Sequence, residues 1–197
     1  MENLNLDSRL ETSYEHVSKE LILSPEEIQE WWPIYDEQFR EMNRSHPCRQ
    51  SFNQAEFEDA MVDQSVLKYV YKEDGEISSM CLFGTDLDVF PWLSQDFFQG
   101  QYPEAFEENN LLYFMALLTK SDNRGQHHAT KLIEYLVDDV KNGWGVDEVV
   151  ISFDCSQTNA EFLPGLVESA IEGTGLADLS LKEQGSQHYY AGKVEFN

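Results

Sequence analysis

An unbroken run of apolar residues, LLYFMALL, occupies positions 111–118 and carries no charge. This run is too short to cross a membrane, and it suits a β-strand that is buried on both faces. After a polar turn, apolar residues recur at spacings of three and four from Gly125 to Gly143, which predicts an amphipathic helix. A second apolar run follows at 146–153. The order strand, turn, helix, strand predicts two parallel strands joined by a right-handed crossover.

The N-terminal part of the chain predicts one weak strand and two helices. Residues 14–23 alternate weakly between polar and apolar side chains. The sequence 24–27, SPEE, has a capping serine, a proline at the first helical position and a glutamate three residues after the cap, so it should start a helix. We expect Pro33 to kink or break this helix, which should end before residue 46. A second helix is predicted over 53–64, with an asparagine cap.

Two β-rich runs, 66–71 and 77–84, flank an Asp74-Gly75 pair and predict a hairpin. The segment 85–110 that follows mixes aromatic residues, acids and prolines. A connection of this length inside a compact domain is usually functional or carries short helices of its own. It could be a satellite of the core, or an aromatic and acidic wall over a substrate cleft.

The C-terminal part predicts a helix over 162–171 and two last strands, at 176–181 and 189–196. The fold class is therefore mixed α/β, with a central mixed sheet flanked by helices. We expect a flexible tail over residues 1–12 and a single domain over 13–197.

The composition limits the partners of this domain. The chain has 197 residues, with 37 acidic and 13 basic side chains and a formal net charge of -24. This balance argues against nucleic acid and anionic membranes, because binding to phosphate depends on lysine and arginine. The acidity is explained by a solvated surface or, alternatively, by attraction of a cationic substrate.

Three cysteines, Cys48, Cys81 and Cys155, are widely spaced and form no paired metal-ligand motif. Their odd number and spacing fit a reducing compartment. The N-terminus lacks the basic start and apolar core of a signal peptide. We therefore expect a cytoplasmic protein with no metal site and no membrane partner.

The turn from Arg124 to Thr130 leads from the buried run into the amphipathic helix. A helix N-terminus presents free backbone N–H groups and the positive end of the helix dipole, which together favour an anion such as phosphate. The small residues Gly125 and Ala129 allow close approach of a ligand to the backbone, and Arg124 adds a guanidinium.

This turn resembles the acyl-CoA-binding motif of the GCN5-related N-acetyltransferase (GNAT) superfamily, the pattern Arg/Gln-x-x-Gly-x-Gly/Ala. Arg124 matches its first position and Ala129 its last, whereas His127 stands where the family prefers glycine. The predicted order of elements also resembles the GNAT fold.

The resemblance implies an acyl-CoA-dependent N-acyltransferase that moves an acetyl or short acyl group from acetyl-CoA, or another acyl-CoA, to a small-molecule or peptide amine. It implies that backbone groups of Leu117, Leu118 and Thr119 meet the pantetheine arm. Asn159 would lie on the pantetheine or adenosine side. The residues implied to hold the pyrophosphate are Arg124, Gly125, Gln126, His127, His128, Ala129 and Thr130.

The implied chemistry is direct attack of a neutral amine on the acyl carbon, with a base that takes the proton. The tyrosine acid usual in the family has no counterpart in this sequence. Asp154, at the end of its predicted strand, and Tyr189 and Tyr190, on the last predicted strand, are the candidate catalytic residues. The alternative is a non-catalytic GNAT-like binding or regulatory module with a degenerate motif. A homodimer would be consistent with exposed aromatic surface.

Overall fold

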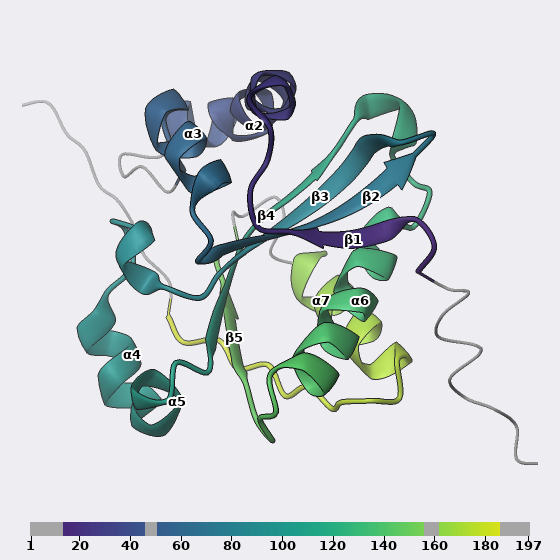
Figure 1. The fold of residues 1–197 in the computed structure, drawn as a ribbon. Helices are drawn as coiled ribbons and strands as arrows, with labels where there is room; N and C mark the ends of the chain where they lie inside the picture. Colours follow the sequence, from purple (N-terminus) through teal and green to yellow (C-terminus); the bar gives the residue numbers. More distant parts are fainter. Residues whose placement is uncertain (1–13, 46–50, 156–161, 186–197) are drawn as a thin grey trace, which may run out of the picture.

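The computed structural model describes residues 14–45, 51–155 and 162–185. Within them lies a five-stranded sheet in the order β1-β2-β3-β4-β5 (Figure 1). Neighbouring strands are antiparallel except for β4 and β5, which are parallel. The strands are β1 Val17–Glu20, β2 Val66–Glu73, β3 Glu76–Gly84, β4 Leu111–Thr119 and β5 Val150–Phe153.

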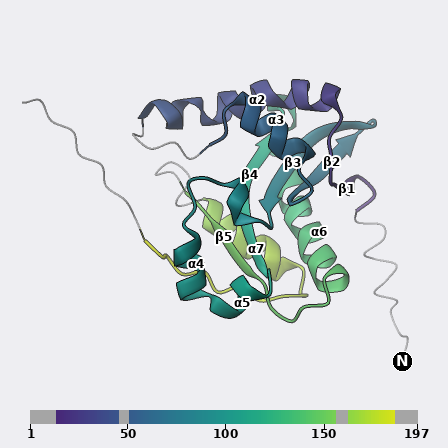
Figure 2. The ribbon, with the colours of Figure 1, turned by 60° about the vertical axis from the view of Figure 1, so that its left-hand side comes forward.

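Helices cover both faces of this sheet. Helices α2 (Pro25–Ser45) and α3 (Gln54–Val62) pack on one face, and α6 (His128–Gly143) and α7 (Leu163–Gly173) pack on the other (Figures 1 and 2). The connection from β3 to β4 holds three short helices, η1, α4 and α5. Their bounds are Leu87–Val89, Gln95–Gln101 and Pro103–Glu107. The predicted fold class, a mixed α/β sheet flanked by helices, is confirmed.

The two predicted helix starts are confirmed by their caps. The Ser24 Oγ accepts a hydrogen bond from the backbone N–H of Glu27, whose carboxylate accepts one from the Ser24 backbone. Asn53 and Glu56 form the same reciprocal pair at α3. Each pair satisfies N–H groups that the first turn of a helix leaves without a partner.

Of the kink or break expected at Pro33, the break does not occur, because α2 continues through this residue to Ser45. A proline inside a helix deprives the carbonyl four residues earlier of its hydrogen bond. Here that carbonyl belongs to Gln29, and both Gln29 and Pro33 lie on the exposed side of α2. Water can therefore replace the lost hydrogen bond.

The predicted hairpin is confirmed, with Glu73 paired to Glu76 across the two-residue turn. Asp74 has φ 51° and Gly75 has φ 86°. Two successive residues with positive φ are the geometry that the twist of a tight hairpin requires, and Asp-Gly is a sequence that adopts it.

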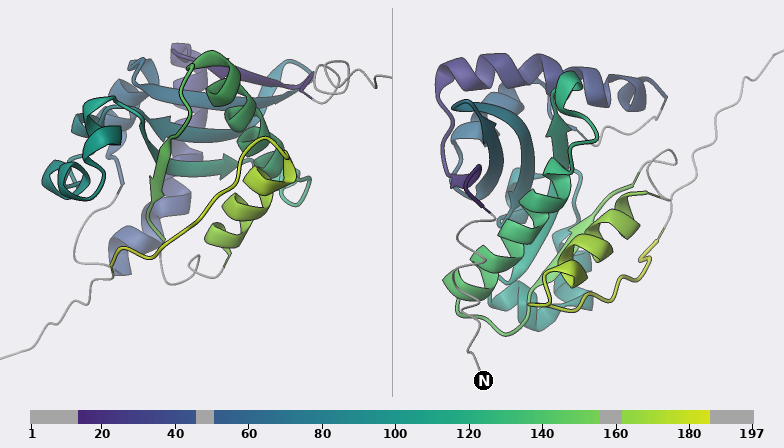
Figure 3. Two further views of the ribbon diagram at one scale, coloured as in Figure 1. Left: turned by 90° about the horizontal axis from the view of Figure 1, so that it is seen from below. Right: turned by 90° about the vertical axis from the view of Figure 1, so that its right-hand side faces the viewer.

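The strand β4 lies between two hydrophobic clusters. Leu111, Tyr113 and Leu118 belong to the cluster that includes side chains of α2 and α3. Leu112 and Phe114 belong to the cluster under α6 and α7. The apolar run at 111–118 was thus correctly interpreted as a strand covered on both faces. Figure 3 shows the helical layers on either side of the sheet.

The segment 85–110 carries short helices, as predicted, and extends the core. The side chains of Phe90 and Phe98 are buried. Phe52, which precedes α3, stacks on Phe90 at 5.9 Å between ring centroids and contacts Trp92 at 5.2 Å. The acids of this segment are exposed, and so is Phe97, whereas its other aromatic residues are buried or half-buried.

The strand predicted at 176–181 is wrong, since these described residues form no strand. Leu176 and Leu179 instead pack against the cluster under α6 and α7. The Nζ of Lys141 donates to the Leu176 carbonyl at 2.9 Å. The other predicted terminal segments, 1–12 and 189–196, lie outside the described residues. Of the helices in the described ranges, none has the length and apolar character needed to cross a membrane.

Lys68 on β2 is a fully buried cation. Its Nζ donates to the carbonyls of Leu21 at 2.9 Å and Asp63 at 2.7 Å, so it ties the connection before α2 to the end of α3. Burial lowers the pKa of Lys68 to about 8, against the opposing charge of Asp63. The folded chain therefore releases this proton more readily than the unfolded chain.

This pKa makes stability depend on pH. Between pH 8 and 10.5 the unfolded state binds more protons at Lys68, so rising pH favours the folded state by at most ~1.4 kcal/mol per pH unit. We expect Lys68→Met to remove this contribution, measured as the difference in unfolding free energy from the natural chain across that range. Lys72→Met, on the same strand, is the matched control and should keep it. A difference between Lys68→Met and the natural chain that does not vary with pH would contradict the prediction.

Candidate functional site

The two parallel strands part within the sheet. Their pairing runs from Leu111↔Val150 to Phe114↔Phe153, where β5 ends. The strand β4 continues to Thr119 and pairs with β3 throughout this continuation. On its other side, none of the described residues pairs with it there. The partner of β3 shifts from Ala116 to Phe114, which leaves Met115 as a bulge at the point where the strands part.

The open edge of β4 leads into the turn that the sequence singled out. A short helix, η2 (Ser121–Asn123), is followed by Gly125 with φ 82° and His127 with φ 60°. Apart from Gly125 and its two chain neighbours, no described residue has an atom within 4 Å of where a Gly125 Cβ would stand. This stretch of backbone is therefore open to close approach by a ligand.

The N-terminus of α6 has no capping side chain within the described part of the chain. The starts of α2 and α3 are capped by Ser24 and Asn53, so their first N–H groups already have acceptors. In α6 the first N–H groups keep their capacity to bind an anion, and the helix dipole favours negative charge there.

The predicted cofactor residues occupy two environments. The side chains at 124–127 are exposed around the turn, and Ala129 and Thr130 are half-buried on the first turn of α6. Arg124 and Thr119 line one cleft of about 350 Å³ between the turn and α2, together with Lys120. Lys120 pairs with Glu30 of α2 at 2.6 Å. The half-buried Leu117 and the buried Leu118 lie on the β4 continuation.

The side chain of His128 is buried, unlike the exposed side chains of the turn that precedes it. Its ring is 3% exposed and stacks on Tyr71 at 3.9 Å between ring centroids. Its Nδ1 lies 3.0 Å from the Ser79 hydroxyl. Burial lowers the pKa of His128, with an opposing effect of Glu73. Only the backbone of His128 can therefore serve a ligand at the turn.

Asp154 follows directly after β5, near the point where the strands part. Its carboxylate accepts a hydrogen bond of 2.7 Å from the Tyr113 hydroxyl, which in turn accepts one of 2.9 Å from the indole of Trp92. Burial raises the pKa of Tyr113 well above its ordinary value, and the Asp154 charge raises it further. Tyr113 thus remains a proton donor that fixes the orientation of the Asp154 carboxylate.

Three predicted residues, Asn159, Tyr189 and Tyr190, lie outside the described residues. Phe162 stands immediately before α7 and is 65% exposed. The thiol of Cys155 has its pKa raised by burial and by Asp154, so it stays protonated at neutral pH and is a poor nucleophile.

Sequence reasoning missed Tyr113 and Trp92 as partners of Asp154. The sequence places Tyr113 only within the apolar run. Its hydroxyl was the available signal, because the hydroxyl of a buried tyrosine usually has a hydrogen-bond partner. Gln38 was also missed. Its side-chain Nε2 donates to the Leu117 carbonyl at 2.7 Å, across 79 positions of the sequence.

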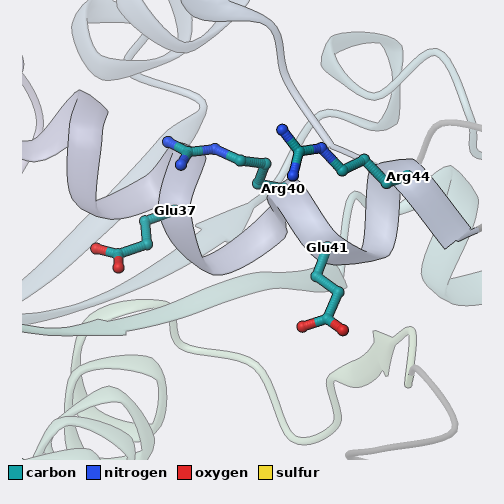
Figure 4. A pocket seen from close by; sticks show the side chains of 4 residues that line it. All are labelled: Glu37, Arg40, Glu41 and Arg44. Atoms are coloured by element: carbon teal, nitrogen blue, oxygen red, sulfur yellow. The ribbon is translucent and has the colours of Figure 1, made fainter.

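A second pocket, of about 440 Å³, lies on α2 away from these residues. It is lined by Glu37, Arg40, Glu41 and Arg44, which project from one exposed helix (Figure 4). Arg40 also pairs with Asp36 at 2.5 Å. Its lining holds two glutamates and two arginines, so the pocket favours neither sign of charge in a ligand.

No protein-family model matches the sequence, and neither does any curated protein. The solved structures that align with it include several acetyltransferases. The ribosomal-protein-alanine N-acetyltransferase from Brucella melitensis biovar Abortus 2308 is 12% identical, with a TM-score of 0.48 over 89% of this chain and 99% of that one. An aminoglycoside acetyltransferase from an uncultured soil metagenomic sample, in complex with sisomicin, is 13% identical, with a TM-score of 0.48 over 90% and 97%.

The aminoglycoside acetyltransferase AAC(6')-Ib, in complex with coenzyme A and kanamycin, is 18% identical, with a TM-score of 0.46 over 77% of this chain and 83% of that one. Similarity at this level does not extend to activity or substrate.

His127 offers a test of the turn geometry. A side chain in the left-handed region costs up to about 1–2 kcal/mol relative to glycine, which adopts it freely. We expect His127→Gly to raise the unfolding free energy by about 0.5–1 kcal/mol in denaturant titrations. Gln126→Gly, at a neighbouring position without positive φ, is the control and should lower it. Equal changes in both variants would show that the turn does not hold His127 in this conformation.

Proposed function

We propose that this protein is an acyl-CoA-dependent N-acyltransferase that transfers an acetyl or other short acyl group to an amine. The observation that carries the proposal is the continuous path from the open edge of β4 to the uncapped N-terminus of α6. A strand edge offers hydrogen bonds to an extended chain that carries amides, and a helix N-terminus offers them to phosphate. Coenzyme A has these two parts in one molecule.

The residues present fit such a co-substrate. Backbone groups of Leu117, Leu118 and Thr119 would contact the pantetheine arm, and the backbone from Gly125 to Thr130 would bind the pyrophosphate. The exposed guanidinium of Arg124 would add a charged donor. We also assign Asn159 to the binding of this ligand. Bound acetyl-CoA would supply the acyl group as a reactive thioester.

The proposed acceptor is a primary amine, and a cationic one fits the acidic chain best. Attack requires a neutral amine, so a base must accept its proton. We assign this role to Asp154, whose carboxylate is held by Tyr113 beside the end of β5. Tyr189 and Tyr190 are proposed as donors to the leaving thiolate.

Isothermal titration with acetyl-CoA tests the binding step. We expect Arg124→Ala to weaken binding about tenfold, the effect of losing one charged hydrogen-bonding group. Arg44→Ala removes an exposed arginine of α2 and should leave the affinity unchanged. Absence of any heat or thermal shift with the natural chain would overturn the proposal, and equal loss in both variants would overturn the placement of the pyrophosphate.

Asp154→Asn tests the chemical step. Release of free thiol from acetyl-CoA would be followed with kanamycin, a polyamine and an amine-bearing peptide as acceptors. Loss of a general base lowers kcat by about 10²–10³-fold, while the KM for acetyl-CoA should stay unchanged. Asp147→Asn, an exposed acid before β5, is the control. Binding of acetyl-CoA without turnover of any amine would instead support a non-catalytic binding module.

A further inference from the structure

Beyond the end of β5, some backbone groups of β4 face the uncovered edge of the sheet, and the pairing with β3 identifies them. The backbone N–H of Lys120 donates to the Ser78 carbonyl of β3 at 3.1 Å. In an antiparallel pair, successive residues alternate between facing the partner strand and facing away from it. The backbone groups of Leu117 and Thr119 therefore face away from β3, toward the side where β5 is missing.

Gln38 reaches this side from α2. Its Nε2 donates to the Leu117 carbonyl at 2.7 Å, although the residues lie on different layers of the fold. Gln38, Thr119 and Arg124 line the same cleft between α2 and the turn. A side-chain amide thus takes the position that the N–H group of an added strand, or of an amide-bearing ligand, would take.

We propose that Gln38 is a specificity-determining residue that competes with the acyl donor for the Leu117 carbonyl. This inference rests on the proposed function. A donor with an amide N–H directed at this carbonyl must displace Gln38 before it gains the hydrogen bond. Exchange of one neutral hydrogen bond for another gives little net free energy, so Gln38 lowers the affinity for the amide-bearing arm. It leaves the binding of phosphate at α6 unaffected.

The competition is local to one hydrogen bond and does not hold the fold together. The Gln38 side chain is exposed, and α2 is anchored elsewhere by the buried Trp31 and Tyr35. Removal of the amide should therefore open the edge without unfolding the helix. Methionine suits this purpose because it has a similar length and no amide donor.

The test compares two ligands on Gln38→Met and on the natural chain by isothermal titration. Acetyl-CoA carries both the arm and the phosphates, whereas 3′-phosphoadenosine 5′-diphosphate keeps the pyrophosphate and lacks the arm. We expect Gln38→Met to bind acetyl-CoA about 3–10-fold more tightly, and the diphosphate with unchanged affinity. Gln54→Met, a glutamine substitution on α3, is the matched control and should change neither.

The outcomes separate this inference from the function on which it rests. If the natural chain binds acetyl-CoA and Gln38→Met binds it no better, the role of Gln38 is overturned while the proposed function stands. Tighter binding of both ligands by Gln38→Met would also overturn it, because the effect would not act through the arm. If only Gln38→Met binds acetyl-CoA, the role of Gln38 is supported and the function proposed for the natural chain is overturned; if neither chain binds it, both fail.

Discussion

The constraint on which this structure depends is that β4 must be covered on both faces. Its side chains alternate between the cluster under α2 and α3 and the cluster under α6 and α7, so neither helical layer can be lost without exposing it. Its two edges are paired to different extents. The strand β3 pairs with nearly the whole of one edge, whereas β5 covers only the first part of the other. The candidate site begins where that cover stops.

Much of the fold could be predicted from the sequence because its signals are local. The caps at Ser24 and Asn53 and the Asp74-Gly75 turn each act over a few residues, and the structure follows them. The errors arose where contacts between residues far apart in the sequence determine the structure. Leu176 and Leu179 pack against the cluster under α6 and α7, and within the described part of the chain 176–181 forms no strand. Sequence spacing cannot distinguish such packing from strand pairing. The continuity of α2 at Pro33 depends on which side of the helix faces water.

The same distinction applies to the candidate site. The turn at the start of α6 was visible in the sequence, because glycine and a change of hydrophobic period mark it. The burial of the His128 ring against Tyr71 was not visible, since it depends on the β2–β3 hairpin passing beside the turn. The hydrogen bonds from Tyr113 to Asp154 and from Gln38 to Leu117 join residues far apart in the chain. Such pairs have no spacing signal, and only the folded arrangement reveals them.

The strand order β1-β2-β3-β4-β5 repeats the order of the chain, and this has a consequence for folding during synthesis. Each antiparallel strand can pair with one already made, so the sheet can grow as the chain leaves the ribosome. The strand β4 joins it before α6, β5 and α7 exist. Until they are made, one apolar face and one edge of β4 stay uncovered, which are the conditions under which strands of different chains associate. The nascent chain is therefore most exposed to aggregation between the completion of β4 and that of α7.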